Sequence, residues 1–163
     1  MPGAGKSTLG AELSVILGYH FFDLDVEIEV NEGLTVAEIF KNRGAAEFRK
    51  AEKKALIELT NSRKSFLMST GGGTPCYYSG IDYMNENGIT VFINTDINKI
   101  INRIVKQQEK RPMFSDANGV QIKEKMHELY EKRYEYYKKA NIIIEEKDIN
   151  IKSITYKLLD DQS

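Results

Sequence analysis

The first eight residues limit the possible folds more than any other part of the chain. Gly3-Ala4-Gly5-Lys6-Ser7-Thr8 matches the end of the pattern GxxxxGK[ST], and an apolar helical stripe follows it directly. In this pattern the glycines let backbone N–H groups approach a phosphate, the lysine neutralises it, and the serine hydroxyl is a ligand for Mg²⁺. A glycine-rich turn before an ordinary helix is the alternative. We expect residues 3–8 to bind the phosphates of a nucleoside triphosphate, with Lys6 also catalytic and Ser7 also a metal ligand.

The strand that usually leads into such a loop is absent from the sequence. The first glycine of the pattern would fall one position before Met1. A central parallel strand pairs with a neighbour on both edges, so its loss would leave backbone groups of both neighbours unpaired. We therefore expect that Met1 is not the natural start and that roughly ten residues of apolar strand ending in Gly precede it. The alternative from a different class is an inactive fragment or a binding protein.

Short apolar segments and amphipathic segments alternate through the rest of the chain. The apolar runs predict strands, and apolar residues spaced three and four apart predict helices between them. The expected strands cover residues 19–24, 65–69, 89–93 and 142–144, and the expected later helices cover residues 97–105, 120–139 and 151–159. This alternation is typical of a parallel α/β sheet wrapped by helices.

Local signals mark the ends of the earlier helices. The first helix is expected to end at Gly18, and Thr35 with Glu38 forms a capping box for a short helix that ends near Gly44. Two apolar stripes are expected to face the core: Leu9, Leu13, Ile16 and Leu17 in the first helix, and Phe48, Ala51, Ala55 and Leu59 in the helix after Gly44. Polar residues 107–119 are too many for a tight connection and predict a mobile lid.

Composition excludes several classes of function. The 163 residues carry a net charge of -1, so no basic field exists to attract nucleic acid or an anionic membrane. The length suits a single domain, residues 1–163, with one core. The single cysteine, Cys76, cannot form an internal disulfide, and no segment resembles a signal peptide or a membrane span. We expect a cytoplasmic protein.

Two carboxylates end the expected strand 19–24. Asp23 and Asp25 are spaced i, i+2, so on a strand both side chains leave the same face at its carboxyl end, where ligands bind in parallel sheets. We expect Asp23 to hold Mg²⁺ and Asp25 to take the proton from an attacking hydroxyl as the phosphoryl group is transferred. The alternative is that both residues cap the following helix.

Two arginines suit an anionic acceptor. Arg49 and Glu52 lie i, i+3 on one helix, so the carboxylate would orient the guanidinium, although most such pairs are surface ion pairs. Arg133 interrupts the apolar stripe of the helix 120–139, where a buried arginine needs an anionic partner. That partner is either a structural carboxylate or the carboxylate of a bound substrate.

A run of glycines and an arginine in the expected lid complete the candidate site. Gly71, Gly72 and Gly73 follow the strand 65–69 and permit a close approach of the backbone to a ligand, with a flexible loop as the alternative. Arg111 would lie over the transferring phosphate when the lid closes and excludes water. A disordered surface arginine is the alternative.

The segments GAGKST, FFDLD, EFRKAE, STGGG and KRPMF stand in this order, and Arg133 with Tyr137 follows them. In this combination the chain closely resembles the shikimate kinase family over almost its whole length. The resemblance implies a P-loop three-layer α/β/α fold of the nucleoside-monophosphate-kinase type, with five parallel strands in the order 2-3-1-4-5. Strand 1 is the one that this sequence lacks. The implied activity is ATP-dependent phosphorylation of the 3-hydroxyl of shikimate, a step toward chorismate and the aromatic amino acids, by a monomer with Mg²⁺.

The resemblance also implies roles for single residues. Arg49 and Arg133 would hold the shikimate carboxylate, Asp25 would face its hydroxyl, and the three glycines would line the same site. Arg111 would be the lid arginine, and Arg103 takes the place of the arginine that stacks on adenine. The lid reads RPMF where the family usually has leucines after the proline. A gluconate kinase or a nucleotide kinase shares the fold and the loop, but neither explains FRxxE together with GGG.

Overall fold

The computed structural model describes residues 1–62, 65–106 and 119–160. These residues fall in two compact units, and each is described by itself. One unit is Gly5–Asn87, and the other joins Met1–Ala4 to the chain from Gly88 onward. The expected single domain stays a prediction, and the expected lid lies outside the described residues except for Gly119, which begins a helix.

The unit Gly5–Asn87 holds a pair of parallel strands and the helices around it. Its elements are α1 (Lys6–Leu17), β1 (His20–Asp23), α2 (Leu24–Glu32), α3 (Val36–Ser62), β2 (Phe66–Ser69), the 3₁₀ turn η1 (Thr74–Cys76) and α4 (Gly80–Asn87). The two strands are in register from His20 opposite Phe66 to Asp23 opposite Ser69. Both strands therefore end at the same edge of the sheet, where the loops that follow them lie close together.

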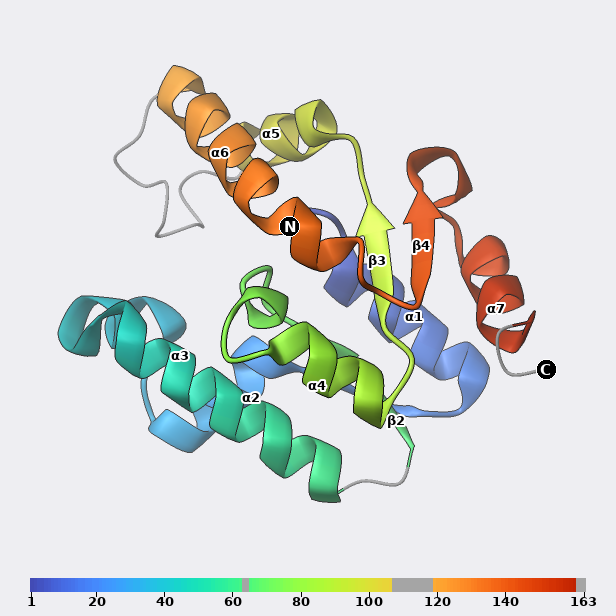
Figure 1. Cartoon of the computed structure of the whole chain (residues 1–163), viewed down its shortest axis with the longest axis horizontal. Coiled ribbons are helices and arrows are strands. Elements are labelled where there is room, and N and C mark those ends of the chain that lie inside the picture. The colour runs from blue at the N-terminus through green and yellow to red at the C-terminus, as the bar shows by residue number, and fades with distance from the viewer. Residues whose placement is uncertain (63–64, 107–118, 161–163) are drawn as a thin grey trace. The chain divides into compact units, whose positions relative to one another are not determined.

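The second unit also contains one pair of parallel strands. Its elements are β3 (Val91–Asn94), α5 (Ile97–Lys106), α6 (Gly119–Tyr137), β4 (Ile142–Glu145), the 3₁₀ turn η4 (Glu146–Asp148) and α7 (Ile151–Asp160). Strands β3 and β4 lie side by side and in register, and α7 packs beside β4 (Figure 1). No helix among the described residues is long and apolar enough to cross a membrane.

The strand pairs confirm the expected fold class. In the order 2-3-1-4-5, strands 2 and 3 are neighbours and strands 4 and 5 are neighbours, and these correspond to the observed parallel pairs β1–β2 and β3–β4. The four observed strands lie within one or two residues of the expected ends, which is the usual uncertainty of strand boundaries. The described part of the chain is thus a parallel α/β fold of the expected kind.

Local sequence signals place several helix ends correctly. Gly18 ends α1 in a left-handed conformation, with φ of 68°. The capping box forms as expected, because the Glu38 carboxylate accepts from the Thr35 backbone N–H over 2.8 Å and the Thr35 hydroxyl accepts from the Glu38 N–H over 3.2 Å. Gly44, with φ of 83° and ψ of 172°, breaks α3 into two helical pieces where the sequence predicted a helix end.

The prediction of which residues of α1 face the core is partly wrong. Ile16 is 56% exposed, whereas Gly10, Leu13 and Ser14 are buried. A Cβ on Gly10 would lie 2.6 Å from the ring of Phe21, so this glycine lets α1 approach β1 more closely than a larger residue would. The helix is therefore rotated toward its small residues, which an apolar stripe does not reveal.

Each unit has its own apolar core. In the first unit the core joins α2 to both pieces of α3, and Tyr83 and Met84 of α4 pack against it; its buried residues are Leu24, Ile28, Ile39, Phe48, Ala55, Leu56 and Leu59. In the second unit the most buried side chains are Ile100, Ile104, Ile122, Met126 and Ile144. The predicted stripe of the second piece of α3 is thus confirmed. The sequence pattern did not predict η1 or α4, because the eight residues of α4 are too few to show a clear apolar period, although Ile81, Tyr83 and Met84 pack inward.

Candidate active site

The glycine-rich loop has the backbone shape that its motif requires. Gly3 and Gly5 both adopt left-handed conformations, with φ of 78° and 90°, which residues other than glycine rarely adopt. Gly5 is the N-cap of α1, and its carbonyl accepts the first helical hydrogen bond, from Leu9 N–H over 3.0 Å. The first N–H groups of a helix have no partner within it, and together with Lys6 they suit a phosphate.

Hydroxyl and carboxylate oxygens meet beside this loop. The Ser7 hydroxyl donates to Asp23 Oδ2 over 2.6 Å and lies 3.1 Å from the hydroxyl of Ser69. Asp23 and Ser69 are the last residues of β1 and β2 and stand opposite each other in the sheet. Because Mg²⁺ prefers such oxygen ligands and keeps several waters beside substrate phosphates, Ser7 and Asp23 fit the ligand set predicted for it. Among the described residues, no group of three His, Cys, Asp or Glu side chains forms a cage for a metal ion.

The two aspartates do not share one strand, which corrects the geometry expected from their spacing. Strand β1 ends at Asp23, and Asp25 lies in the first turn of α2. Asp23 is the N-cap of this helix, and its Oδ1 accepts from the Asp25 backbone N–H over 3.1 Å. The strand stops early because this side chain satisfies a backbone donor of the helix. Asp23 therefore caps a helix and also contacts Ser7.

Asp25 is a partly buried carboxylate with an unusual pKa. Burial, followed by the nearby charges of Asp23 and Glu52, raises its pKa from 3.8 to about 6, while Lys6 and Arg49 act in the opposite direction. Its buried Oδ1 accepts no hydrogen bond from a described residue. A buried acceptor without a partner is uncommon, and a carboxylate with a raised pKa beside a lysine is typical of a catalytic position.

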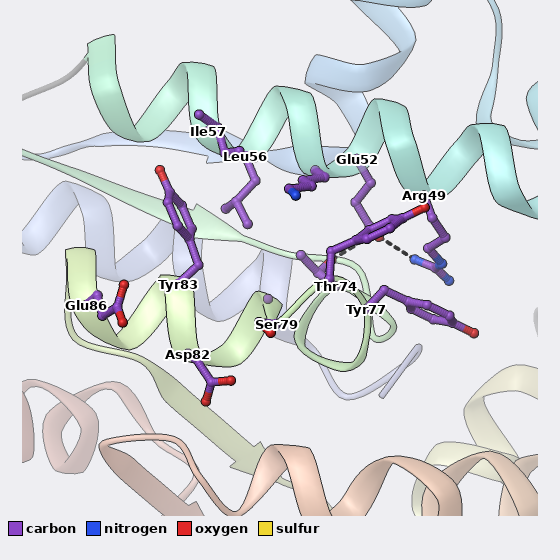
Figure 2. A pocket seen from close by; sticks show the side chains of 13 residues that line it. Arg49, Glu52, Leu56, Ile57, Thr74, Tyr77, Ser79, Asp82, Tyr83 and Glu86 are labelled. Atoms are coloured by element: carbon purple, nitrogen blue, oxygen red, sulfur yellow. Dashed lines mark hydrogen bonds and ion pairs between the residues drawn. The ribbon is translucent and has the colours of Figure 1, made fainter.

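Arg49 and Glu52 form a buried pair, unlike the surface ion pair that was the alternative. Their side chains are 13% and 3% exposed, and Arg49 Nη1 donates to Glu52 Oε2 over 2.5 Å. The other carboxylate oxygen, Oε1, accepts from the Thr74 hydroxyl over 2.7 Å, so one carboxylate joins α3 to η1 (Figure 2). Truncating either member would leave an uncompensated buried charge.

The three glycines after β2 form a packed loop, which argues against the alternative of a flexible one. A Cβ on Gly71 would lie 3.0 Å from Glu52 Oε1 and 3.3 Å from Asp25 Oδ1, and a Cβ on Gly73 would lie 2.4 Å from Arg49 Nη2. The absence of side chains at these positions therefore lets the carboxylates and the guanidinium approach the backbone. Gly72 lies between them in the same loop.

The remaining predicted residues belong to the second unit or lie outside the described residues. Arg103, on α5, donates from Nη1 to the carbonyl of Gly3 over 3.1 Å, which places its guanidinium at the backbone of the phosphate loop. The hydroxyl of Thr95 donates to the carbonyl of Ala4 over 3.2 Å. Arg133 is partly buried on α6, and its part in the acceptor site stays a prediction. Arg111 lies outside the described residues.

Sequence reasoning missed three contributors to this site. Ser69 closes the hydroxyl cluster, Thr74 binds Glu52, and Tyr77 places its ring 4.4 Å from the guanidinium carbon of Arg49. A pocket of about 380 Å³ lies beside this group and is lined by residues of α3, η1 and α4 (Figure 2). Only Ser69 had a signal in the sequence, since it ends a predicted strand next to the glycines.

A phosphate loop, a Mg²⁺-type oxygen pair and a carboxylate with a raised pKa, gathered at the ends of parallel strands, define a P-loop phosphotransferase. The model of the family described as shikimate kinase matches residues 2–162. The chain is 39% identical over 145 residues to a shikimate kinase of Clostridium botulinum, covering 88% of this chain and 82% of that protein. It is 36% identical over 140 residues to that of Parabacteroides distasonis, covering 86% and 80%.

Solved structures agree with these matches. A crystal structure of shikimate kinase from Bacteroides thetaiotaomicron superposes with a TM-score of 0.88 at 32% identity, covering 98% of this chain and 92% of that one. The shikimate kinase of Acinetobacter baumannii in complex with shikimate gives a TM-score of 0.84 at 32% identity, covering 97% and 86%. The chain belongs to the shikimate kinase family and is an enzyme of the kinase class.

Proposed function

We propose that this enzyme transfers the γ-phosphoryl group of ATP to the 3-hydroxyl of shikimate, giving shikimate 3-phosphate and ADP. The observation that carries the proposal is the surroundings of Asp25, a carboxylate with a pKa of about 6 that lies beside the Gly71 backbone and the Glu52–Arg49 pair. A base with this pKa accepts a proton near neutral pH, and a cation held nearby suits a carboxylated acceptor.

The acceptor side of the site would use three groups. Asp25 would orient the attacking hydroxyl and take its proton as the phosphoryl group is transferred. Arg49 would bind the shikimate carboxylate, because its guanidinium has five N–H donors and gives only one to Glu52 in the bonds among the described residues. The backbone of residues 71–73 would line the same site beside Arg49. Arg133 would add a second cation for the same carboxylate.

The nucleotide side would use the loop of residues 3–8. Its N–H groups and Lys6 would hold the β- and γ-phosphates, while Ser7 and Asp23 would hold Mg²⁺ through their oxygens. When bound, Mg²⁺ supplies positive charge that neutralises the phosphates and the leaving group. Arg103 would cover the adenine, and Arg111 would approach the transferring phosphate.

Further expectations belong to the same proposal. We propose a single domain of residues 1–163, a lid at about residues 107–119, a monomer, and a cytoplasmic location. The support for the location is a single cysteine and an ATP-dependent reaction of small metabolites.

The test is ADP release with ATP and Mg²⁺ in the presence of shikimate, gluconate or a nucleoside monophosphate. Of the three acceptors, only shikimate is expected to give turnover, and ³¹P NMR should identify the product as a 3-phosphate ester. Turnover with gluconate or a nucleotide but not with shikimate would overturn the acceptor assignment. Silence with all three acceptors in a folded preparation would refute the proposed activity of this chain and favour the alternative of an inactive fragment.

Matched substitutions locate the acceptor carboxylate. Arg49→Ala and Arg133→Ala should each weaken shikimate binding by about 1.5 to 3 kcal/mol, the range for hydrogen bonds to charged groups, with little change in ATP affinity. Lys54→Ala removes an exposed cation from the same helix as Arg49 and should change neither affinity. Calorimetric titration measures all three, and native shikimate affinity in both arginine variants would refute the assigned carboxylate site.

A further inference from the structure

The guanidinium of Arg49 is held on several sides by groups of its own unit. Its Nη1 donates to Glu52, and its carbon lies 5.0 Å from the ring centroid of Phe48 and 4.4 Å from that of Tyr77. The backbone at Gly73 lies so close to it that a Cβ there would come within 2.4 Å of Nη2. An arginine side chain has several rotatable bonds, so this number of contacts fixes a group that would otherwise move freely.

The ring of Tyr77 reaches this guanidinium from a short, well-anchored turn. The 3₁₀ turn η1 directly precedes Tyr77, and Thr74 at its start is tied to the backbone of Gly71 by an N–H bond of 3.2 Å and to Glu52 by its hydroxyl. After the turn, the carbonyl of Tyr77 accepts from Gly80 N–H over 2.9 Å. Glu52 therefore anchors both Arg49 and the turn that carries Tyr77, as Figure 2 shows.

Tyr77 is not a core residue. It is 48% exposed, close to the 51% of its neighbour Tyr78, whose ring lies 5.2 Å from the ammonium of Lys53. An aromatic ring contacts a guanidinium through the π-face and leaves the N–H groups at the guanidinium edge available for a carboxylate. Tyr77 and Tyr78 thus present two similar ring–cation contacts, of which one involves the arginine proposed to bind substrate.

We propose that Tyr77 is a positioning residue for the acceptor carboxylate: its ring holds the Arg49 guanidinium in the orientation in which the free N–H edge binds shikimate. This inference rests on the proposed function, in which Arg49 contacts the carboxylate. Tyr77 itself acts through Arg49 and contacts no reacting atom. Its loss therefore affects acceptor binding and leaves the phosphoryl transfer step largely unchanged.

The test compares three variants in steady-state kinetics with shikimate and ATP varied separately. Tyr77→Leu keeps apolar bulk but removes the ring, and it should raise the KM for shikimate about two- to fivefold, with kcat and the KM for ATP unchanged. Tyr77→Phe keeps the ring and should behave like the unmodified enzyme. Tyr78→Leu removes the neighbouring ring–cation contact and should change none of these constants. Thermal melting confirms that each variant is folded.

A double-mutant cycle separates this inference from the proposed function. If Arg49→Ala raises the KM for shikimate and Tyr77→Leu adds nothing in the Arg49→Ala background, the two residues act together, as proposed. An equal effect of Tyr77→Leu with and without Arg49, or no effect in either background, would overturn the inference and leave the proposed function standing. A native KM for shikimate in Arg49→Ala would instead refute the role of Arg49 on which both depend.

Discussion

Replacing Asp25 by asparagine should separate the effect of this carboxylate on the free energy of unfolding from its contribution to the reaction. Its pKa is raised from 3.8 to about 6, first by burial and then by the Asp23 and Glu52 carboxylates. A carboxyl group with a higher pKa in the folded state stabilises the protein only while it is protonated. That stabilisation is complete below about pH 3.8 and is lost as the pH rises through about 6.

The size of the effect follows from the two pKa values. At about 1.4 kcal/mol for each pKa unit, ionised Asp25 would destabilise the folded state by about 3 kcal/mol above pH 7. Water reaches part of this side chain and screens its charge, so we expect about 1 to 3 kcal/mol. Asparagine has nearly the same shape and no charge. We compare the free energy of unfolding of Asp25→Asn with that of the unmodified protein at each pH. The difference should shift in favour of the variant by about 1 to 3 kcal/mol as the pH rises from 4 to 7.5.

The assay is urea unfolding followed by circular dichroism at these two pH values. Glu86→Gln changes an exposed carboxylate on α4 of the same unit and serves as the matched control. In parallel, kcat/KM of the unmodified enzyme should fall as the pH drops below about 6, because a protonated Asp25 cannot accept the substrate proton. Asp25→Asn should reduce kcat by about 10²-fold or more while shikimate affinity changes little.

Two results would refute this reasoning. A stability difference between Asp25→Asn and the unmodified protein that is the same at pH 4 and pH 7.5 would show that folding does not raise the pKa of Asp25. Unchanged turnover in Asp25→Asn would remove the residue as the general base, whatever its pKa.

Two other substitutions test the packed loop and the metal site. Gly73→Ala would place a Cβ 2.4 Å from Arg49 Nη2, so it should displace the guanidinium and raise the KM for shikimate about tenfold. Gly88→Ala is the control, because a Cβ on Gly88 meets open space, and it should leave this KM unchanged. Equal KM values in the two variants would show that Arg49 does not depend on the glycine. Ser7→Ala should raise the Mg²⁺ concentration needed for half-maximal activity about tenfold, and Ser7→Thr should restore it, since only the hydroxyl is required. A normal Mg²⁺ requirement in Ser7→Ala would contradict the proposed ligand.

Features encoded within a few neighbouring residues were predicted well from the sequence. The left-handed glycine at Gly18, the capping box at Thr35 and the break at Gly44 each depend on backbone groups at most a few positions away. The phosphate loop belongs to the same class, because its glycines and Lys6 are adjacent in the chain. The order of the motifs was sufficient to indicate the family.

Asp25 shows what spacing could not decide. Its i, i+2 separation from Asp23 suggested a shared strand face, but the Asp23 side chain caps α2 and ends the strand two residues before Asp25. The raised pKa also depends on Glu52, which comes from another helix. Local propensity cannot reveal a pKa that distant charges and burial determine.

The sequence by itself determined the phosphate loop, the alternation of strands and helices, and the residue types available for an anionic acceptor. Only the tertiary structure decided that the Glu52 carboxylate binds both Arg49 and Thr74, although Thr74 lies 22 positions further along the chain. It also decided that the ring of Tyr77 lies against the Arg49 guanidinium. The physical reason is that α3 and η1, which are separate in the sequence, meet through packing around the buried Glu52 carboxylate and the glycines after β2. Contacts of this kind have no period and no motif in the sequence.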